Sequence, residues 1–264
     1  LGTGTAAMRI RGAGGSRINI TLDGVSLNSP EDQTVFWANM NSYGALMGSV
    51  QIQRGIGTST NGDGAFGGSI SLATATPNYR PSAEVSGSFG TYNTYNTGVK
   101  FSTGLLGNHF VFDGAYHETA TDGFLHGTAG RSGSYYGGLT YLGNNFQIRY
   151  KNIGNFEKTG QAWNGVVAGN NDASLMGSDI KTYKDLYERG LGRFNPLYEG
   201  LMFYYDKWSF PTDANGKYQT YRYKMDNGSY WEKTTDNFYQ NHNILSAVWK
   251  PNTAWSHNIA LHYT

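Results

Sequence analysis

The sequence predicts a membrane-spanning antiparallel β-barrel preceded by a small α+β domain. From Ser82 to the end, polar and apolar residues alternate with a period of two in segments of about ten residues, as in transmembrane β-strands. The connections between these segments alternate between short and long. The 264 residues include 37 Gly, 20 Tyr, 13 Phe and 6 Trp but only 15% charged residues, which suits a sheet that faces lipid on one side.

The region before these segments is predicted to be a small mixed sheet with one short helix. Branched and polar residues alternate, as in half-buried strands, in residues 9–11, 18–22, 50–53 and 70–72. Residues 39–48 carry Met40, Tyr43, Leu46 and Met47 at helical spacing, which predicts the helix. The Asp23-Gly24 pair is a turn sequence.

The alternation also predicts which face of the barrel meets lipid. In residues 146–151, Ile148 and Tyr150 alternate with Arg149 and Lys151. Each cation turned toward lipid near the bilayer midplane would cost about 2–4 kcal/mol. We therefore expect the polar set to face the lumen and the apolar set to face lipid. The same rule turns Phe110 and Phe112 outward, with Asp113 and His117 inward.

Seven strands are predicted, at residues 82–91, 95–103, 108–118, 134–142, 145–155, 240–250 and 254–264. We expect one domain over residues 1–77 and the barrel strands over 78–264, with a long outer loop at about 156–239. Because an open sheet would leave unpaired edges in lipid, the chain is expected to continue beyond Thr264.

Several function classes have no support in the sequence. The net charge of +1 is too small to attract nucleic acid. The sequence has no run of about 18 apolar residues, so no membrane-spanning helix is predicted. No nucleophile elbow, zinc-protease motif or phosphate-binding loop is complete, so we expect no enzyme activity and no cofactor. His109, Asp113 and His117 would span about 26 Å of one strand, too far for a single metal centre.

Three segments resemble the plug domain of TonB-dependent outer-membrane receptors. They are Leu22-Asp-Gly-Val-Ser-Leu27, Val50-Gln-Ile-Gln-Arg-Gly-Ile-Gly57 and Gly64-Ala-Phe-Gly-Gly-Ser-Ile-Ser-Leu72. The resemblance implies a plug, missing its N-terminal part, inside a barrel of about 22 strands. It also implies ligand import across the outer membrane of a Gram-negative bacterium, energised by the TonB–ExbB–ExbD complex.

The ligand class is predicted from the same resemblance. The run from Gln51 to Gly62 is similar to the branch that imports iron complexes such as siderophores, whereas the glycan-importing branch usually has Lys-Asp-Ala near Gln53. Importers of haem, cobalamin or glycans remain alternatives, as does a passive porin or adhesin, although a porin would lack a plug. Expected partners are a ferric chelate, outer-membrane lipid and a surface lipoprotein.

The resemblance also implies ligand contacts. In the family, the loop equivalent to 28–37 rises toward the outside and touches ligand. The predicted contacts are Asn28, Glu31, Asp32, Gln33, Phe36 and Trp37 in this loop, Thr58, Ser59 and Asn61 in a second loop, His117 on a strand, and Trp163 in the long loop. The aromatic residues of the long loop would either bind ligand or pack on one another.

A last prediction concerns how the plug contacts the barrel wall. The plug carries four arginines that we expect to pair with lumen-facing carboxylates, either as fixed salt bridges or as a latch that opens during transport. These predicted contacts are Arg9, Arg11, Arg17 and Arg54 on the plug, and Glu84 and Asp113 on the wall.

Overall fold

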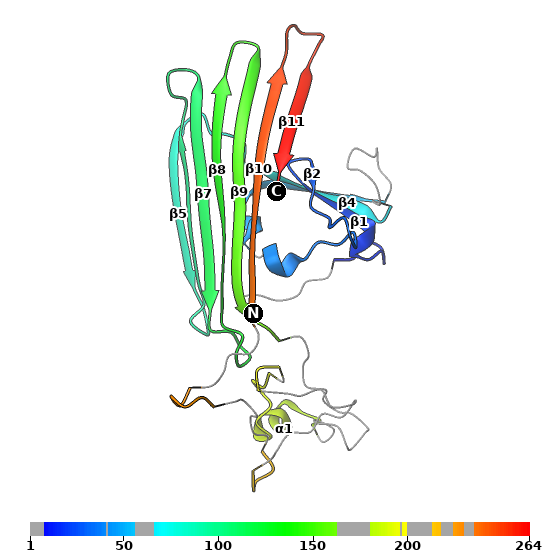
Figure 1. The fold of residues 1–264 in the computed structure, drawn as a ribbon, viewed down its shortest axis with the longest axis vertical. Coiled ribbons are helices and arrows are strands. Elements are labelled where there is room, and N and C mark those ends of the chain that lie inside the picture. The colour runs from blue at the N-terminus through cyan, green and yellow to red at the C-terminus, as the bar shows by residue number, and fades with distance from the viewer. Residues whose placement is uncertain are drawn as a thin grey trace.

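The computed structural model describes residues 8–40, 42–55, 66–162, 180–195, 197–199, 213–217, 224–229 and 235–264. These residues form two sheets, one of four strands and one of seven. The smaller sheet lies beside one face of the taller one (Figure 1). No helix within the described ranges has the length and apolar character needed to cross a bilayer.

The four-stranded sheet, here called the plug sheet, has the order β2-β1-β4-β3. Its strands are β1 (Ile18–Leu22), β2 (Val25–Ser26), β3 (Met47–Arg54) and β4 (Gly68–Thr74). β1 is parallel to β4, and the other neighbours are antiparallel. Every residue of β1 is buried, because neighbours cover both its faces and both its edges are paired. The turn from β1 to β2 uses Asp23 and Gly24 at φ of 49° and 88°, as predicted for a tight hairpin.

The predicted helix over 39–48 is wrong. The chain forms two short 3₁₀ helices, η2 (Trp37–Met40) and η3 (Tyr43–Leu46), and then enters β3. Met40, Tyr43 and Leu46 are buried in the core cluster, as their spacing suggested. They recur every three residues, which fits the three residues per turn of a 3₁₀ helix as well as it fits one face of an α-helix.

The taller sheet, here called the wall, contains the seven predicted antiparallel strands in the order β11-β10-β9-β8-β7-β6-β5. They are β5 (Pro81–Phe89), β6 (Tyr95–Thr103), β7 (Phe110–Thr121), β8 (Gly130–Leu142), β9 (Phe146–Gly160), β10 (Thr235–Trp249) and β11 (His257–Tyr263). β9 and β10 pair further than predicted, from Phe146–Trp249 to Gly160–Thr235. Their connection is therefore 161–234 rather than 156–239.

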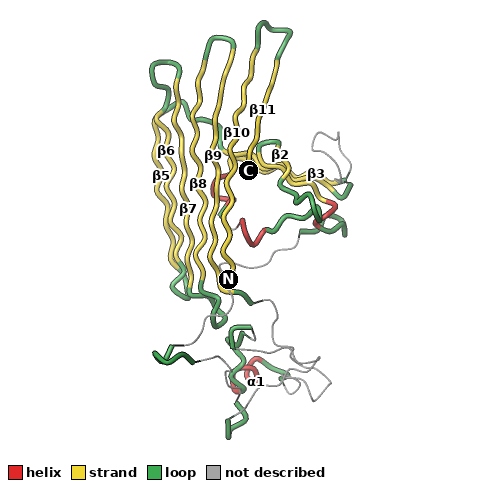
Figure 2. Tube along the Cα trace, viewed as in Figure 1, coloured by secondary structure: helices red, strands yellow, loops and turns green. Residues whose placement is uncertain are grey.

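The two ends of the wall differ. Residues 104–109, 143–145 and 250–256 connect strands at one end, called the turn end (top of Figure 2). The opposite end carries the connections 90–94 and 122–129 and the helix α1 (Tyr183–Glu188), and is called the loop end. The long connection 161–234 leaves the wall at the loop end, as predicted for the outer side of a transmembrane barrel, whereas 90–94 and 122–129 are about as short as the connections at the turn end.

The predicted orientation of the wall strands is confirmed. Phe112 and Ile148 are 45% and 41% exposed on the face away from the plug. Asp113, Arg149 and Lys151 are 8%, 7% and 8% exposed on the opposite face, which the plug covers. In this part of β7 and β9, apolar side chains therefore point outward and charged ones inward.

Several wall glycines lie beneath aromatic rings of a neighbouring strand. A Cβ atom placed on Gly133 would lie 2.5 Å from the Phe156 ring, and one on Gly154 would lie 2.3 Å from the Tyr135 ring. Both glycines face outward, so the rings fold across the sheet surface where a side chain would otherwise stand. Part of the glycine excess therefore serves cross-strand packing of large aromatic residues.

Candidate functional site

Wall side chains hold the plug by donating hydrogen bonds to its backbone. The donors and acceptors are Ser134 Oγ to Ser42 O (2.8 Å), Asn155 Nδ2 to Asn39 O, and Arg149 Nη2 to Ala75 O (3.0 Å). Two of the acceptors lie in or beside the short helices η2 and η3, whose carbonyl groups have few intrahelical partners. Each bond is replaceable by water if the plug moves.

Among the described residues, one ion pair joins the plug to the wall. Lys151 Nζ lies 2.8 Å from Asp23 Oδ2, with the two side chains only 10% and 11% exposed. Lys151 Nζ also donates to Thr74 Oγ1 at 3.0 Å. Asp23 in turn accepts from Thr74 N (3.0 Å) and Thr74 Oγ1 (2.8 Å). The three side chains form one network, here called the Asp23 network.

A second buried network orients Arg149. Its Nη2 atom lies 3.1 Å from Asp113 Oδ2, and Tyr136 Oη donates to the same carboxylate oxygen at 2.6 Å. Arg149 also donates to Tyr136 Oη. Asp113 and Tyr136 therefore hold the guanidinium in the position from which it reaches Ala75 of the plug.

The interface is not wholly polar, although the sequence predicted a polar lumen face. Tyr136, Ile153 and Ile244 of the wall belong to the same buried cluster as Ile20 and Met40 of the plug. This apolar contact lies among the hydrogen bonds described above. The plug is thus seated by a small apolar patch and oriented by polar groups around it.

The predicted arginine contacts are not formed. Asp113 is occupied by Arg149 and Tyr136, and Glu84 is exposed and makes no ion pair in the described ranges. The charge distribution is instead reversed, because the plug supplies the acid and the wall supplies the base. The plug arginines are all exposed, and within the described part of the chain none makes an ion pair: Arg9, Arg11, Arg17 and Arg54.

Asn28, predicted to touch ligand, has a structural role in the plug. Its Oδ1 atom accepts from Ile20 N at 2.7 Å, and its Nδ2 atom donates to Ile18 O at 2.9 Å and to Gln33 O at 2.8 Å. The side-chain amide thus continues the hydrogen-bonding edge of β1. This use leaves Asn28 little capacity to bind anything else.

The rest of the predicted loop is mostly exposed. Glu31, Asp32 and Gln33 lie on the surface, and Phe36 is 58% exposed. Hydrogen bonds from Thr34 Oγ1 (2.7 Å) and Thr34 N (3.0 Å) lower the pKa of Asp32. Trp37 instead packs against the plug core.

Of the remaining predicted ligand residues, the structure describes His117. His117 faces the lumen and lines a cavity of about 160 Å³ with Leu46 and Lys100. Among the described residues no group of three His, Asp or Glu side chains is arranged to hold a metal ion. Four residues named above lie outside the described ranges: Thr58, Ser59, Asn61 and Trp163.

Outer connections assemble at the loop end, a feature the sequence did not predict. His126 Nδ1 lies 2.8 Å from Glu199 Oε1, and His126 N donates to Arg193 O at 2.9 Å. Asn195 Nδ2 donates to His126 O at 2.8 Å. The Arg193 guanidinium lies 5.2 Å from the ring centre of Tyr92. Residues of the long connection thereby pack onto both neighbouring outer turns.

Helix α1 lies in the same outer assembly (Figure 1). It starts with a capping box in which Thr182 Oγ1 accepts from Asp185 N and the Asp185 side chain accepts from Thr182 N. Hydrogen bonds from the backbone of Lys181 and from Thr182 lower the pKa of Asp185.

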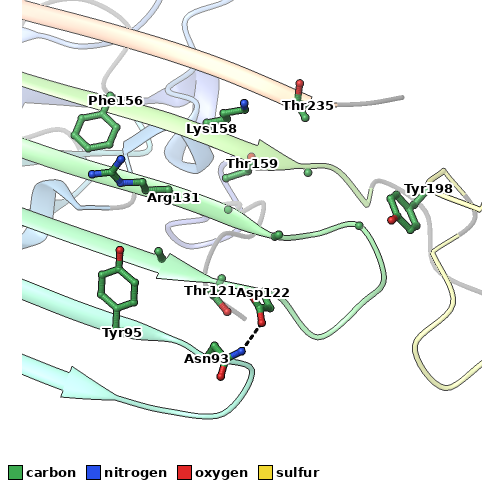
Figure 3. Close-up of a pocket in the computed structure, with 15 residues that line it drawn as sticks. Asn93, Tyr95, Thr121, Asp122, Arg131, Phe156, Lys158, Thr159, Tyr198 and Thr235 are labelled. Atoms are coloured by element: carbon green, nitrogen blue, oxygen red, sulfur yellow. Dashed lines mark hydrogen bonds between the residues drawn. The ribbon is translucent and has the colours of Figure 1, made fainter. Parts of the chain in front are cut away.

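A cavity of about 770 Å³ lies at the loop end of the wall. Figure 3 shows its lining on β6 to β10, with Tyr198 of the long connection at one side. Its lining includes the side chains of Tyr95, Arg131, Phe156 and Lys158.

Comparison with known proteins identifies the first part of the chain. Residues 1–69 match the family model of the TonB-dependent Receptor Plug Domain. Residues 1–69 are a plug domain of the TonB-dependent receptor type. No curated protein sequence matches this chain.

Solved receptors share the fold of the plug and wall. The siderophore receptor PiuA from Acinetobacter baumannii has a TM-score of 0.64 at 12% identity, covering 99% of this chain and 31% of its own. The ferripyoverdine receptor from Pseudomonas aeruginosa gives 0.62 at 13%, covering 98% and 30%. The ferric-catecholate import receptor Fiu from E. coli K12, in its closed form, gives 0.64 at 13%, covering 99% and 30%. The chain thus spans about a third of these receptors, and its wall is a partial barrel.

Proposed function

We propose that the receptor imports a scarce ligand across the outer membrane of a Gram-negative bacterium, energised by TonB–ExbB–ExbD. The observation that carries this proposal is a folded plug on the inner face of a lipid-facing wall, seated by a small apolar patch and oriented by polar contacts that water can replace. A passive porin needs no such plug. The family of the plug domain supports the same conclusion.

The energetics of the interface suit a seal that can be moved. A hydrogen bond that water can replace contributes only about 0.5–1.5 kcal/mol net. The three backbone contacts and the Asp23 network therefore fix the orientation of the plug without making its displacement prohibitive. A force applied to the plug would expose these groups to water, where each finds new partners.

We further propose a ferric siderophore or another iron complex as the ligand. Support comes from the run beginning at Gln51 and from the solved receptors of similar fold, whose names state siderophore or ferripyoverdine binding. The exposed acidic and aromatic groups between Glu31 and Phe36 would contribute contacts, together with Thr58, Ser59, Asn61 and Trp163. Haem, cobalamin and glycans are the competing ligands.

Tryptophan fluorescence of the whole receptor tests the ligand class, and a pair of phenylalanines tests the site. Phe36 and Phe66 are each 58% exposed, but only Phe36 lies in the predicted ligand loop. We expect Phe36→Ala to weaken ferric-siderophore binding about tenfold, since an aromatic anchor commonly contributes more than 1 kcal/mol. Phe66→Ala, the matched control, should change binding less than about twofold.

Two results would reject this account at different levels. Quenching by an oligosaccharide or cobalamin but by no ferric chelate would reject the iron ligand and leave import standing. Equal uptake of labelled ligand by cells with and without TonB would reject energised import itself.

A further inference from the structure

The cavity at the loop end opens on the outward side of the wall. In β8, Ser134 contacts the plug, so Arg131, an odd number of residues away, points to the other face. In β9, Asn155 contacts the plug, and Lys158 accordingly points outward. The register pairs Arg131 directly with Lys158. Two cations therefore stand side by side on the face that meets lipid.

Along the membrane normal, Arg131 and Lys158 lie at the height of the lipid headgroups. The outward aromatic residues of β9 run from Phe146 at the turn end to Phe156 near the loop end. Lys158 follows Phe156 by two residues, which places it about 40 Å along the strand from Phe146 and, at a tilt of about 40°, about 30 Å along the membrane normal. The apolar band of such barrels is about 25 Å tall. Lys158 thus lies just beyond the aromatic belt.

The carboxylate of Glu118 fixes the position of the Arg131 guanidinium. Its Nε and Nη2 atoms donate to Glu118 Oε1 (2.8 Å) and Oε2 (2.7 Å). Glu118 is only 7% exposed and also accepts from Tyr95 Oη (3.0 Å) and Tyr116 Oη. The Arg131 side chain remains 60% exposed, and its Nη1 atom makes no hydrogen bond to the described residues. One edge of a fixed guanidinium is therefore available to an acceptor.

Lys158 adds a positive charge that its surroundings do not compensate. It is exposed and forms no ion pair with any described residue. Directly opposed like charges destabilise a sheet unless a counter-charge is present, and Glu118 neutralises only Arg131. Asp122, the carboxylate among the described lining residues, accepts a hydrogen bond from Asn93 Nδ2 at 2.6 Å on the β6–β7 side of the cavity (Figure 3).

We propose that this cavity binds the phosphorylated headgroup of an outer-leaflet glycolipid. The phosphate would lie between the free edge of Arg131 and the ammonium of Lys158, because guanidinium and ammonium groups both favour phosphate oxygens. The rings of Tyr95 and Phe156 provide the apolar wall that a sugar and the first part of an acyl chain would contact. A free anion would make no use of that wall. The inference rests on the outer-membrane placement proposed above.

The proposal is tested by measuring how much lipid the whole receptor retains. The receptor is first placed in phosphatidylcholine nanodiscs doped with diphosphoryl lipid A. Native mass spectrometry would count the lipid A molecules retained after exchange into undoped nanodiscs. We expect Lys158→Gln to lower the affinity about fivefold, the factor that corresponds to about 1 kcal/mol per cation at a membrane surface. Lys250→Gln, an exposed lysine at the turn end, is the control and should leave retention unchanged.

Lys158→Gln leaves the Arg131–Glu118 pair intact, so it is not expected to disturb folding. Equal retention of lipid A and its dephosphorylated form would overturn the proposal, as would equal retention by Lys158→Gln and the unaltered receptor. Displacement of lipid A by inorganic phosphate alone would also overturn it, because the site would then hold an anion rather than a lipid. Ligand uptake by Lys158→Gln should be unchanged, which separates this test from that of import.

Discussion

Replacing Asp23 by Asn is expected to destabilise the seating of the plug by about 3–5 kcal/mol, because it leaves a buried ammonium without its counter-charge. The amide keeps the shape of the side chain and still accepts from Thr74 N. The change therefore isolates the charge of Asp23 opposite Lys151, which is 2.8 Å away. Denaturant unfolding of the plug within the whole receptor measures the loss.

The control is a double-mutant cycle. Lys151→Met alone removes the cation and leaves Asp23 with its two bonds from Thr74. If the charges act as a pair, the double variant should lose clearly less stability than the sum of the single variants. Additive losses would show that each side chain acts alone and that no ion pair joins plug and wall.

Ile20→Ala should cost the plug about 2–5 kcal/mol, since it empties a site at the centre of the core. Ile20 is 1% exposed in β1 and pairs with Ile70 of β4. Ile20→Val removes a single methylene and should cost only about 0.5–1.5 kcal/mol. Urea midpoints of the plug transition for both variants give the comparison. Losses of equal size in the two variants would contradict the close packing described here.

The period-two alternation sufficed to predict the wall and its orientation. The cost of placing Arg149 or Lys151 in lipid decided which face turned inward, and both side chains lie against the plug. That argument needs only one strand and the bilayer. The ends of β9 and β10 were missed because pairing between Phe156 and Tyr239 extends beyond the segments whose alternation was counted.

Contacts between plug and wall could not be predicted in the same way. Asp23 and Lys151 are 128 residues apart, and their pairing depends on how one folded unit sits on another. In the sequence, Asp23 is only a turn residue. Contacts were predicted for the plug arginines because they are numerous. In the structure these arginines are exposed, and the buried plug residue that pairs with the wall is Asp23 at the hairpin turn. A lumen-facing lysine such as Lys151, costly to leave unpaired, was the available signal for an acidic partner on the plug.

The contacts of the outer connections around His126 and Glu199 could not be predicted from the sequence either. The histidine lies in the connection 122–129 and the glutamate in the long connection, so no local pattern relates them. Tyrosine-rich composition predicted packing or ligand contact without distinguishing the two. The described residues show packing of Tyr198 over Gly127 and of Arg193 over Tyr92.

The central claim is that a folded plug covers the inner face of a wall whose outer face meets lipid. The chain contains no cysteine, so single nitroxide labels can be placed along β9 in the whole membrane-embedded receptor. Labels at Phe146, Ile148 and Tyr150 should be accessible to oxygen dissolved in lipid and not to a water-soluble nickel chelate. Labels at Ile153 and Asn155 should be shielded from both. Access of the nickel chelate to Ile153 and Asn155, or no alternation along the strand, would contradict the account.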